Sequence, residues 1–343
     1  MTSRSRLFVL MVRPAVLLLL VMYLALGLAQ AGGGQNPLLL AVPALVMVGF
    51  LLFSTALNDL ADEAVDRVNL PADSRRLLVT GARSRRDLRL VAATTGCLTV
   101  LAAATVGWQA AVVVLVGMAV SAGYSLPPTR LASRGAVAAL LLPACYVAVP
   151  YLLGIFATAM AVTPGDLALL LGLYLGFIGR ILLKDFRDVR GDALFGKRTF
   201  LVRHGRAATC RTSALFWLTG TVVVLATTRS PSLVLIVALA VLAVLAMLLL
   251  RQLAVDRGRQ RDERLISTLA IVGRGMMLVL LGHLSVVNAG WSVVASSALL
   301  VLLCVLTLGQ AHDMMTRGPR LVAWSPKGVT ARQVPAGEAD VSR

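Results

Sequence analysis

Two acid-rich segments of this chain combine residue types and spacings that suit metal binding. The first, NDLADEAVD, runs from Asn58 to Asp66 at the end of a long apolar run. On a helix, Asn58, Asp62 and Asp66 are four residues apart and share one side, and Asp59 lies three residues before Asp62. Carboxylate and amide oxygens suit Mg²⁺, which keeps waters and substrate phosphates among its ligands. The pattern is equally compatible with a solvated acidic helix end.

The second acidic segment, KDFRDVRGD, runs from Lys184 to Asp192. Asp185, Asp188 and Asp192 follow one another at i, i+3 and i+7, which again places them on one helical face. This segment also ends an apolar run and is flanked by basic residues. Carboxylates at a membrane interface are costly and usually mark function. Two such clusters on the same predicted side of the membrane favour a joint site over simple solvation.

Basic and hydroxyl side chains lie close to both clusters in the sequence. Arg13 either snorkels to the interface or contacts an anion at the mouth of a cavity. An arginine-rich loop that includes Arg76 follows the first cluster; such a loop either sets topology or offers guanidinium groups to phosphate oxygens. Tyr124 and Ser125 end the fourth apolar run and offer hydroxyl donors at the same depth, and Arg130 follows them.

The composition predicts an all-α, polytopic transmembrane bundle. Of 343 residues, 58% are hydrophobic and 14% are charged, and the mean hydropathy is +0.84. A soluble domain has nearer a quarter of its residues charged. The net charge of +17 would indicate nucleic acid for a soluble protein; here we expect no nucleic acid, and basic loops that face anionic lipid or a phosphorylated substrate. The four cysteines are scattered and predict neither a disulfide framework nor a metal site.

Ten apolar runs are long enough to be candidate spans. They cover residues 8–30, 37–57, 88–107, 110–125, 136–157, 164–183, 212–228, 231–250, 265–288 and 292–311. Basic residues concentrate in alternate connections, so the positive-inside rule places both termini in the cytoplasm. We expect a multi-pass protein of the plasma membrane with nine or ten spans. Residues 1–312 form the transmembrane domain and residues 313–343 a polar, disordered tail.

A few side chains inside the runs are ambiguous. Tyr146 and Phe177 belong either to packing or to a cavity in which their faces stabilise a carbocation. Arg274 and His283 are the main polar exceptions within the ninth run. For both, packing between helices or lipid contact is favoured over a charge relay.

Together these motifs resemble the UbiA superfamily of intramembrane prenyltransferases. The resemblance extends from Arg13 to about Gly205 and includes both acidic segments and the Tyr124 to Arg130 stretch. It implies that a polyprenyl diphosphate is held by two Mg²⁺ ions, and that the prenyl group passes to an aromatic or other lipophilic acceptor with release of diphosphate. The metal ligands that it implies are Asn58, Asp62, Asp185 and Asp188, with Asp59 as a direct or supporting ligand. The diphosphate contacts are Arg13, Arg76, Tyr124, Ser125, Arg130 and Lys184, and Asp66 and Asp192 are the candidates for activating the acceptor.

Two alternatives remain open. A terpene cyclase of the same superfamily would ionise the diphosphate at the same site and capture the cation with the chain's own double bonds. A transporter or cation-binding membrane protein would instead carry charges deep within several spans.

Overall fold

The protein is a bundle of long helices, seen in a computed structural model that describes residues 11–32, 37–69, 77–186, 189, 196 and 198–316. The described chain contains helices and no strands, and ten stretches of it are long and apolar enough to cross a membrane. The expected fold class is therefore confirmed, and helices occupy the predicted runs 110–125 and 292–311 as well.

The element bounds are as follows. The long helices are α2 (Pro14–Ala31), α3 (Ala41–Ala61), α5 (Arg85–Val106), α6 (Trp108–Ser125), the adjoining α7 (Ala136–Pro143) and α8 (Val149–Phe156), α9 (Pro164–Ile181), α11 (Phe200–Thr227), α12 (Leu233–Leu253), α13 (Arg259–Val287) and α14 (Val293–Thr316). The short elements are η1 (Pro37–Leu40), α4 (Glu63–Asn69), η2 (Leu131–Ser133), the π-helical η3 (Ala144–Ala148) and η4 (Leu182–Phe186).

Several boundaries differ from those expected; α13, for example, begins at Arg259 and not at 265. The first turns of α11 begin at Phe200, well before the predicted 212, where the Thr199 hydroxyl accepts a hydrogen bond from the backbone N–H of Val202 and caps the helix start. A kink at Gly205, whose φ is 78°, separates these turns from the rest of the helix. Helix α14 continues to Thr316, past the domain boundary expected at 312. The remainder of the expected tail, 317–343, lies outside the described residues.

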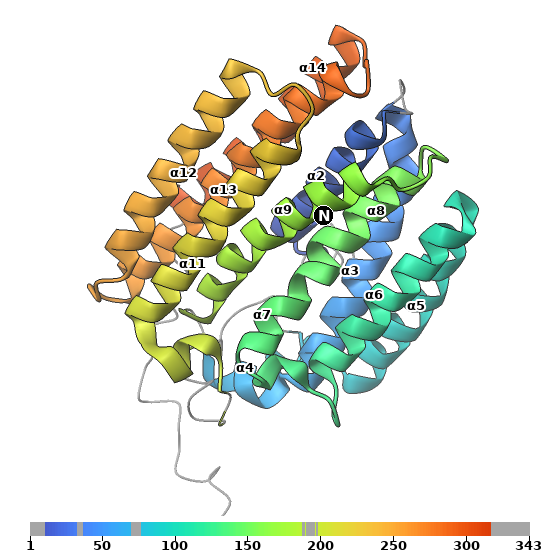
Figure 1. Ribbon diagram of the computed structural model, residues 1–343. Coiled ribbons are helices and arrows are strands. Elements are labelled where there is room, and N and C mark those ends of the chain that lie inside the picture. The colour runs from blue at the N-terminus through green and yellow to red at the C-terminus, as the bar shows by residue number, and fades with distance from the viewer. Residues whose placement is uncertain are drawn as a thin grey trace, which may run out of the picture.

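Helix α2 forms the centre of the bundle. Nearly every residue from Leu18 to Ala29 is buried, which is the pattern of a helix surrounded by neighbours on all sides. It packs against α8, α13, α3 and α14. Figure 1 shows α5 and α6 on one flank of the bundle and α11 and α12 on the other.

Glycines allow α2 to approach α8 closely. A Cβ atom at Gly27 would lie 1.9 Å from the Tyr151 carbonyl oxygen, and one at Gly154 would lie 2.1 Å from the Leu24 carbonyl oxygen. Small residues at such crossings bring backbones together where lipid provides no hydrophobic drive for helix association. The crossing therefore fixes the position of α2 against the rest of the core.

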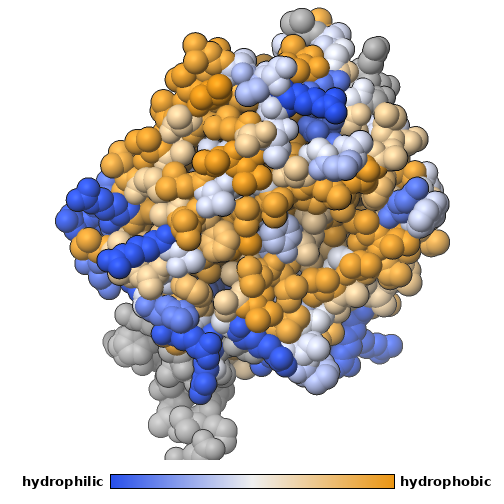
Figure 2. Space-filling model, in the orientation of Figure 1, coloured by the Kyte–Doolittle hydropathy of each residue, from blue (hydrophilic) through white to orange (hydrophobic). Residues whose placement is uncertain are grey.

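The outer surface suits a bilayer. Leucine and valine side chains on α5, α11, α12 and α14 are exposed, and Figure 2 shows apolar residues across the middle of the visible face with hydrophilic residues gathered mainly at its lower and left rims. Ion pairs link the start of α2, the end of α3 and the loop after α6. These three segments therefore meet at one end of the bundle.

Candidate active site

The first acidic motif straddles a break between two helices. Helix α3 ends at Ala61, Asp62 forms a bend, and α4 begins at Glu63. The backbone hydrogen bonds nevertheless keep their four-residue spacing: the N–H of Asp62 donates to the Asn58 carbonyl at 2.9 Å, and that of Asp66 to the Asp62 carbonyl at 2.8 Å. The continuous helix expected from the spacing is thus bent at Asp62, while the periodicity survives.

Arginines from two other elements balance the charge of this motif. The Arg13 guanidinium, just before α2, donates to Asp59 Oδ1 at 3.1 Å. The Arg130 guanidinium, after α6, donates to Asp62 Oδ1 at 3.2 Å, and the Asn58 amide donates to Asp62 Oδ2 at 3.0 Å. Because the Asp59 side chain is only 3% exposed, its charge depends on such a cation for stability.

Both arginines have left-handed backbones. Arg13 has φ 49° and Arg130 has φ 31°, a region that side-chain-bearing residues rarely adopt. Such strain is concentrated at functional sites, where the surrounding structure must hold it. Ala159 and Ser230, in connections at the opposite end of the bundle, share this conformation. It is the pairing of both arginines with carboxylates of one motif that makes this end the candidate site.

The second motif begins on η4, which continues α9. Its Asp185 is buried, and Lys184 Nζ lies 2.9 Å from Asp185 Oδ1. Three of the predicted site residues, Arg76, Asp188 and Asp192, lie outside the described residues. The described start of the second motif thus shows the same arrangement as the first, with a buried carboxylate next to a cation.

Tyr146 is near cations of both motifs. It belongs to η3, a widened turn that follows Pro143, whose missing N–H breaks the regular helical pattern. Tyr146 is within electrostatic range of Arg13, which pairs with the first motif, and of Lys184, which pairs with the second. Both motifs therefore border one region of the bundle.

The hydroxyl residues predicted for the site lie at its edge. Tyr124 is also within electrostatic range of Tyr146. Ser125 is buried and is the last residue of α6. One turn deeper, the Ser121 hydroxyl donates to the Ser54 hydroxyl at 2.8 Å and fixes α6 against α3.

The donor chemistry of the two motifs fits a hard divalent cation. Asn58, Asp59, Asp62 and Asp185 offer only oxygen ligands, as Mg²⁺ prefers. Within the described ranges no three acidic, histidine or cysteine side chains are close enough together to hold a metal ion, and cationic side chains contact the carboxylates instead. A metal at this position would take over the charge balance that these side chains provide.

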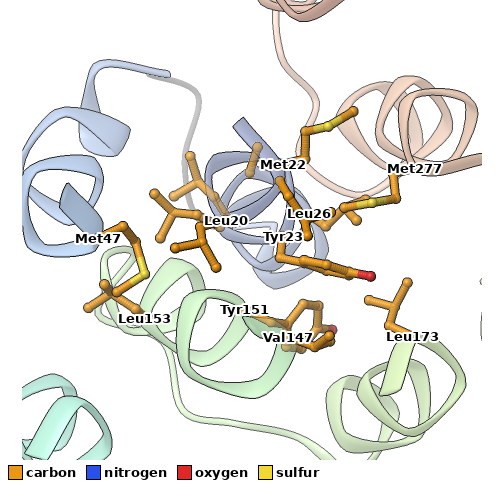
Figure 3. Close-up of a cluster of buried hydrophobic side chains, with 14 of the residues drawn as sticks. Leu20, Met22, Tyr23, Leu26, Met47, Val147, Tyr151, Leu153, Leu173 and Met277 are labelled. Carbon is orange, nitrogen blue, oxygen red and sulfur yellow. The ribbon is translucent and has the colours of Figure 1, made fainter. Parts of the chain in front are cut away.

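An apolar interior continues from the site into the bundle. Tyr146 stacks on Phe177 with ring centroids 5.9 Å apart, and Tyr23 meets the edge of Phe177 at 6.1 Å. Figure 3 shows Tyr23 among buried side chains from α2, α9 and the α7 to α8 segment. Sequence reasoning singled out Tyr146 and Phe177 but missed Tyr23, because an aromatic residue within a continuous apolar run has no distinguishing pattern.

The sequence matches a known family over most of its length. A model of the UbiA prenyltransferase family matches residues 18–272. The chain belongs to this family. A curated relative, the bacteriochlorophyll synthase 34 kDa chain of Chloroflexus aurantiacus, is 30% identical over 159 residues. That match covers 46% of this chain and 50% of the relative, so it spans about half of the relative's length.

Solved structures of UbiA proteins share the fold. One, from work on digeranylgeranylglyceryl phosphate synthase, covers 83% of this chain and 100% of its own at a TM-score of 0.62 and 15% identity. Another, a UbiA homologue from Archaeoglobus fulgidus bound to DMAPP and Mg²⁺, covers 82% of this chain and 99% of its own at a TM-score of 0.60 and 15% identity. At such low identity these similarities establish the architecture.

Proposed function

We propose that this protein transfers a polyprenyl group from a prenyl diphosphate to a lipophilic acceptor and releases diphosphate, with Mg²⁺ as cofactor. The observation that carries the proposal is that Arg13 and Lys184, the cations paired with the carboxylates of the two motifs, are both within electrostatic range of Tyr146. Family membership supports the reaction class. The UbiA homologue solved with DMAPP and Mg²⁺ supports the substrate class and the cofactor.

The diphosphate would bind at the cationic side chains. Arg13, Arg130 and Lys184 already face the motif carboxylates, and each has donors suited to phosphate oxygens. Asn58, Asp59, Asp62 and Asp185, together with Asp188, would hold Mg²⁺, which when bound offsets the negative charge that develops on the leaving diphosphate. In the proposed complex the cationic side chains turn from carboxylate oxygens to phosphate oxygens.

The chain's apolar interior would protect the reacting carbon. When the allylic C–O bond breaks, the electron pair leaves with the diphosphate and a prenyl cation remains. The Tyr146 ring, within electrostatic range of Arg13 and Lys184, would lie near this position, and the faces of such rings attract cations. The acceptor then forms the new bond and loses a proton, for which Asp66 and Asp192 are our candidate bases.

Purified protein incubated with Mg²⁺ and prenyl diphosphates of several chain lengths tests the proposal. We expect diphosphate release to require Mg²⁺ and to increase when a lipid extract supplies an acceptor. A cyclised hydrocarbon formed without any acceptor would identify the terpene cyclase alternative. Diphosphate release that is unaffected by EDTA, or absent with every chain length and extract, would contradict the proposal.

A further inference from the structure

A second pair of cationic side chains, Arg274 and Arg180, lies close to the acidic motifs: Arg274 contacts Ala15, two residues after Arg13, and Arg180 precedes Lys184 by four residues. Arg274 on α13 is 2% exposed, so it faces neighbouring helices and not lipid. Its Nη2 donates to the Ala15 carbonyl of α2 at 3.0 Å, whereas its Nε and Nη1 have no hydrogen-bond partner among the described residues. A buried guanidinium with two unused donor positions is costly unless a ligand completes it.

A second arginine lies next to it. Gly273 precedes Arg274 in the sequence. A Cβ atom built on Gly273 would lie 4.0 Å from the Cδ of Arg180, which belongs to α9. The Arg180 guanidinium also lies 5.8 Å from the centre of the Phe177 ring. Within the described part of the chain, no carboxylate forms an ion pair with Arg274. The buried Arg274 guanidinium, with its two unused donors, therefore favours an anion on the side where Arg180 lies.

An apolar cavity adjoins the two arginines. It has a volume of about 70 Å³ and lies between α2, α9, α11, α12 and α13. Arg180 and Gly273 form part of its wall, together with Tyr23, Phe177 and Met277. A cationic wall on an otherwise apolar cavity matches a ligand with one acidic group attached to a hydrocarbon body.

We propose that Arg180 and Arg274 bind the carboxylate or monophosphate group of a lipophilic acid, whose apolar part enters the adjoining cavity. Two sources have this chemistry: the acceptor of the prenyl transfer, or an anionic lipid of the membrane. The acceptor assignment rests on the proposed function, whereas binding itself does not. Phe177 connects the two sites, because it lines this cavity and stacks on Tyr146 beside the acidic motifs.

Matched acid and alcohol probes test the binding. Purified protein in neutral detergent and EDTA is titrated with hexadecyl phosphate, palmitate and hexadecanol. We expect the wild type to bind both acids about tenfold more tightly than the alcohol, as one charge-assisted contact would give. Arg274→Gln should lose that preference, and Arg274→Lys should keep part of it. Equal binding of acid and alcohol by the wild type, or an unchanged preference in Arg274→Gln, would overturn the proposal.

Two controls separate this site from the diphosphate site. Arg229→Gln removes an arginine from the connection between α11 and α12 and should leave the preference for acids intact. Asp185→Asn should abolish Mg²⁺-dependent diphosphate release and still bind the acids without Mg²⁺. A wild type that binds the acids but never releases diphosphate would refute the proposed function alone.

Competition identifies the source of the ligand. If a membrane lipid is the natural occupant, phosphatidic acid should displace hexadecyl phosphate and phosphatidylcholine should not. If the acceptor is the occupant, hexadecyl phosphate should inhibit transfer of labelled geranylgeranyl groups to extract lipids, with at least about tenfold weaker inhibition in Arg274→Gln. Absence of both effects would refute both assignments.

Discussion

The two ends of α2 stabilise buried carboxylates in different ways. At its start, Asp59 is 3% exposed and pairs with the Arg13 guanidinium. Near its end, about 27 Å away along an 18-residue helix, Asp166 is 4% exposed and accepts hydrogen bonds from Gln30 Nε2 at 3.0 Å and from the backbone N–H and hydroxyl of Thr163, each at 2.8 Å. One carboxylate is paired with a cation, and the other is bound by neutral donors.

The network at the far end joins several helices. Gln30 Oε1 accepts a hydrogen bond from the Asn288 amide at 3.0 Å, and the Tyr151 hydroxyl donates to the Asp166 carbonyl at 3.2 Å. These bonds link α2, α8, α9 and the end of α13. Neutral hydrogen bonds of this kind stabilise the fold. In a cation–carboxylate pair, by contrast, the carboxylate can bind a metal and the cation can bind a phosphate.

Removing a motif carboxylate should have the largest effect. We expect Asp62→Ala and Asp185→Ala to lower diphosphate release at least about 100-fold, because each removes a candidate oxygen ligand, while both proteins still insert and unfold near the wild-type temperature. Diphosphate release per folded molecule, measured beside thermal unfolding in detergent, checks this. Retained turnover in either variant would refute the assignment.

Changing a paired arginine should have a smaller effect at the same end. Arg13→Gln should weaken prenyl diphosphate binding about tenfold, since one charge-assisted contact is lost; the concentration dependence of diphosphate release measures it. Arg229→Gln, at the opposite end of the bundle, is the matched control and should change little. Activity lost in the control would mean that the predicted membrane orientation is inverted.

A change at Asp166, near the other end of α2, should alter the stability of the protein and not its activity. Asp166→Ala removes the N3 carboxylate of the α9 capping box and leaves the Gln30 amide without its acceptor, so we expect the free energy of unfolding to fall by about 1–3 kcal/mol. Turnover per folded molecule should stay near the wild-type value. An Asp166→Ala protein that is as stable as the wild type but inactive would contradict the assignment of a structural role to Asp166.

The smallest effect is expected at Glu63, a partly exposed acid next to the first motif. A hydrogen bond from Arg67, with a further one from Arg85, lowers the pKa of Glu63 below its usual value of 4.5. A lowered carboxylate pKa stabilises the fold above the usual value, and this contribution disappears as the pH falls through the folded-state pKa. Glu63→Gln should therefore cost less than about 1 kcal/mol at pH 7. The difference in Tm between the two proteins should vanish in acid; a difference that grows in acid would contradict this account.

The spacing of acidic residues in the sequence identified the first motif, at the Arg13 end of α2. Asp62 and Asp66 follow Asn58 at four-residue intervals, and the hydrogen bonds across the bend preserve that register. The contact between Arg13 and Asp59 could not be predicted from the sequence, because the two residues are 46 positions apart in the chain. Their pairing depends on how α2 packs beside α3.

The hydrogen-bond network around Asp166, near the other end of α2, could be predicted from the sequence only in part. Thr163 and Asp166 form a capping box whose pattern is visible in the sequence. Its continuation through Gln30 to Asn288 joins residues 258 positions apart, and no local pattern predicts such a contact. Arg274 stood out as a lone charge in an apolar run, but only packing shows that it faces α2 and the neighbourhood of Arg180.

The sequence by itself determined the membrane class, the helical spans and the residue types of the site, because hydropathy and helical period are local properties. The tertiary structure decided which cation pairs with which carboxylate, that Tyr146 is within electrostatic range of Arg13 and Lys184, and that Arg274 is buried next to Gly273, which lines an apolar cavity. These features depend on helix crossings such as that of Gly27 with Gly154, where backbones from distant parts of the chain come into contact.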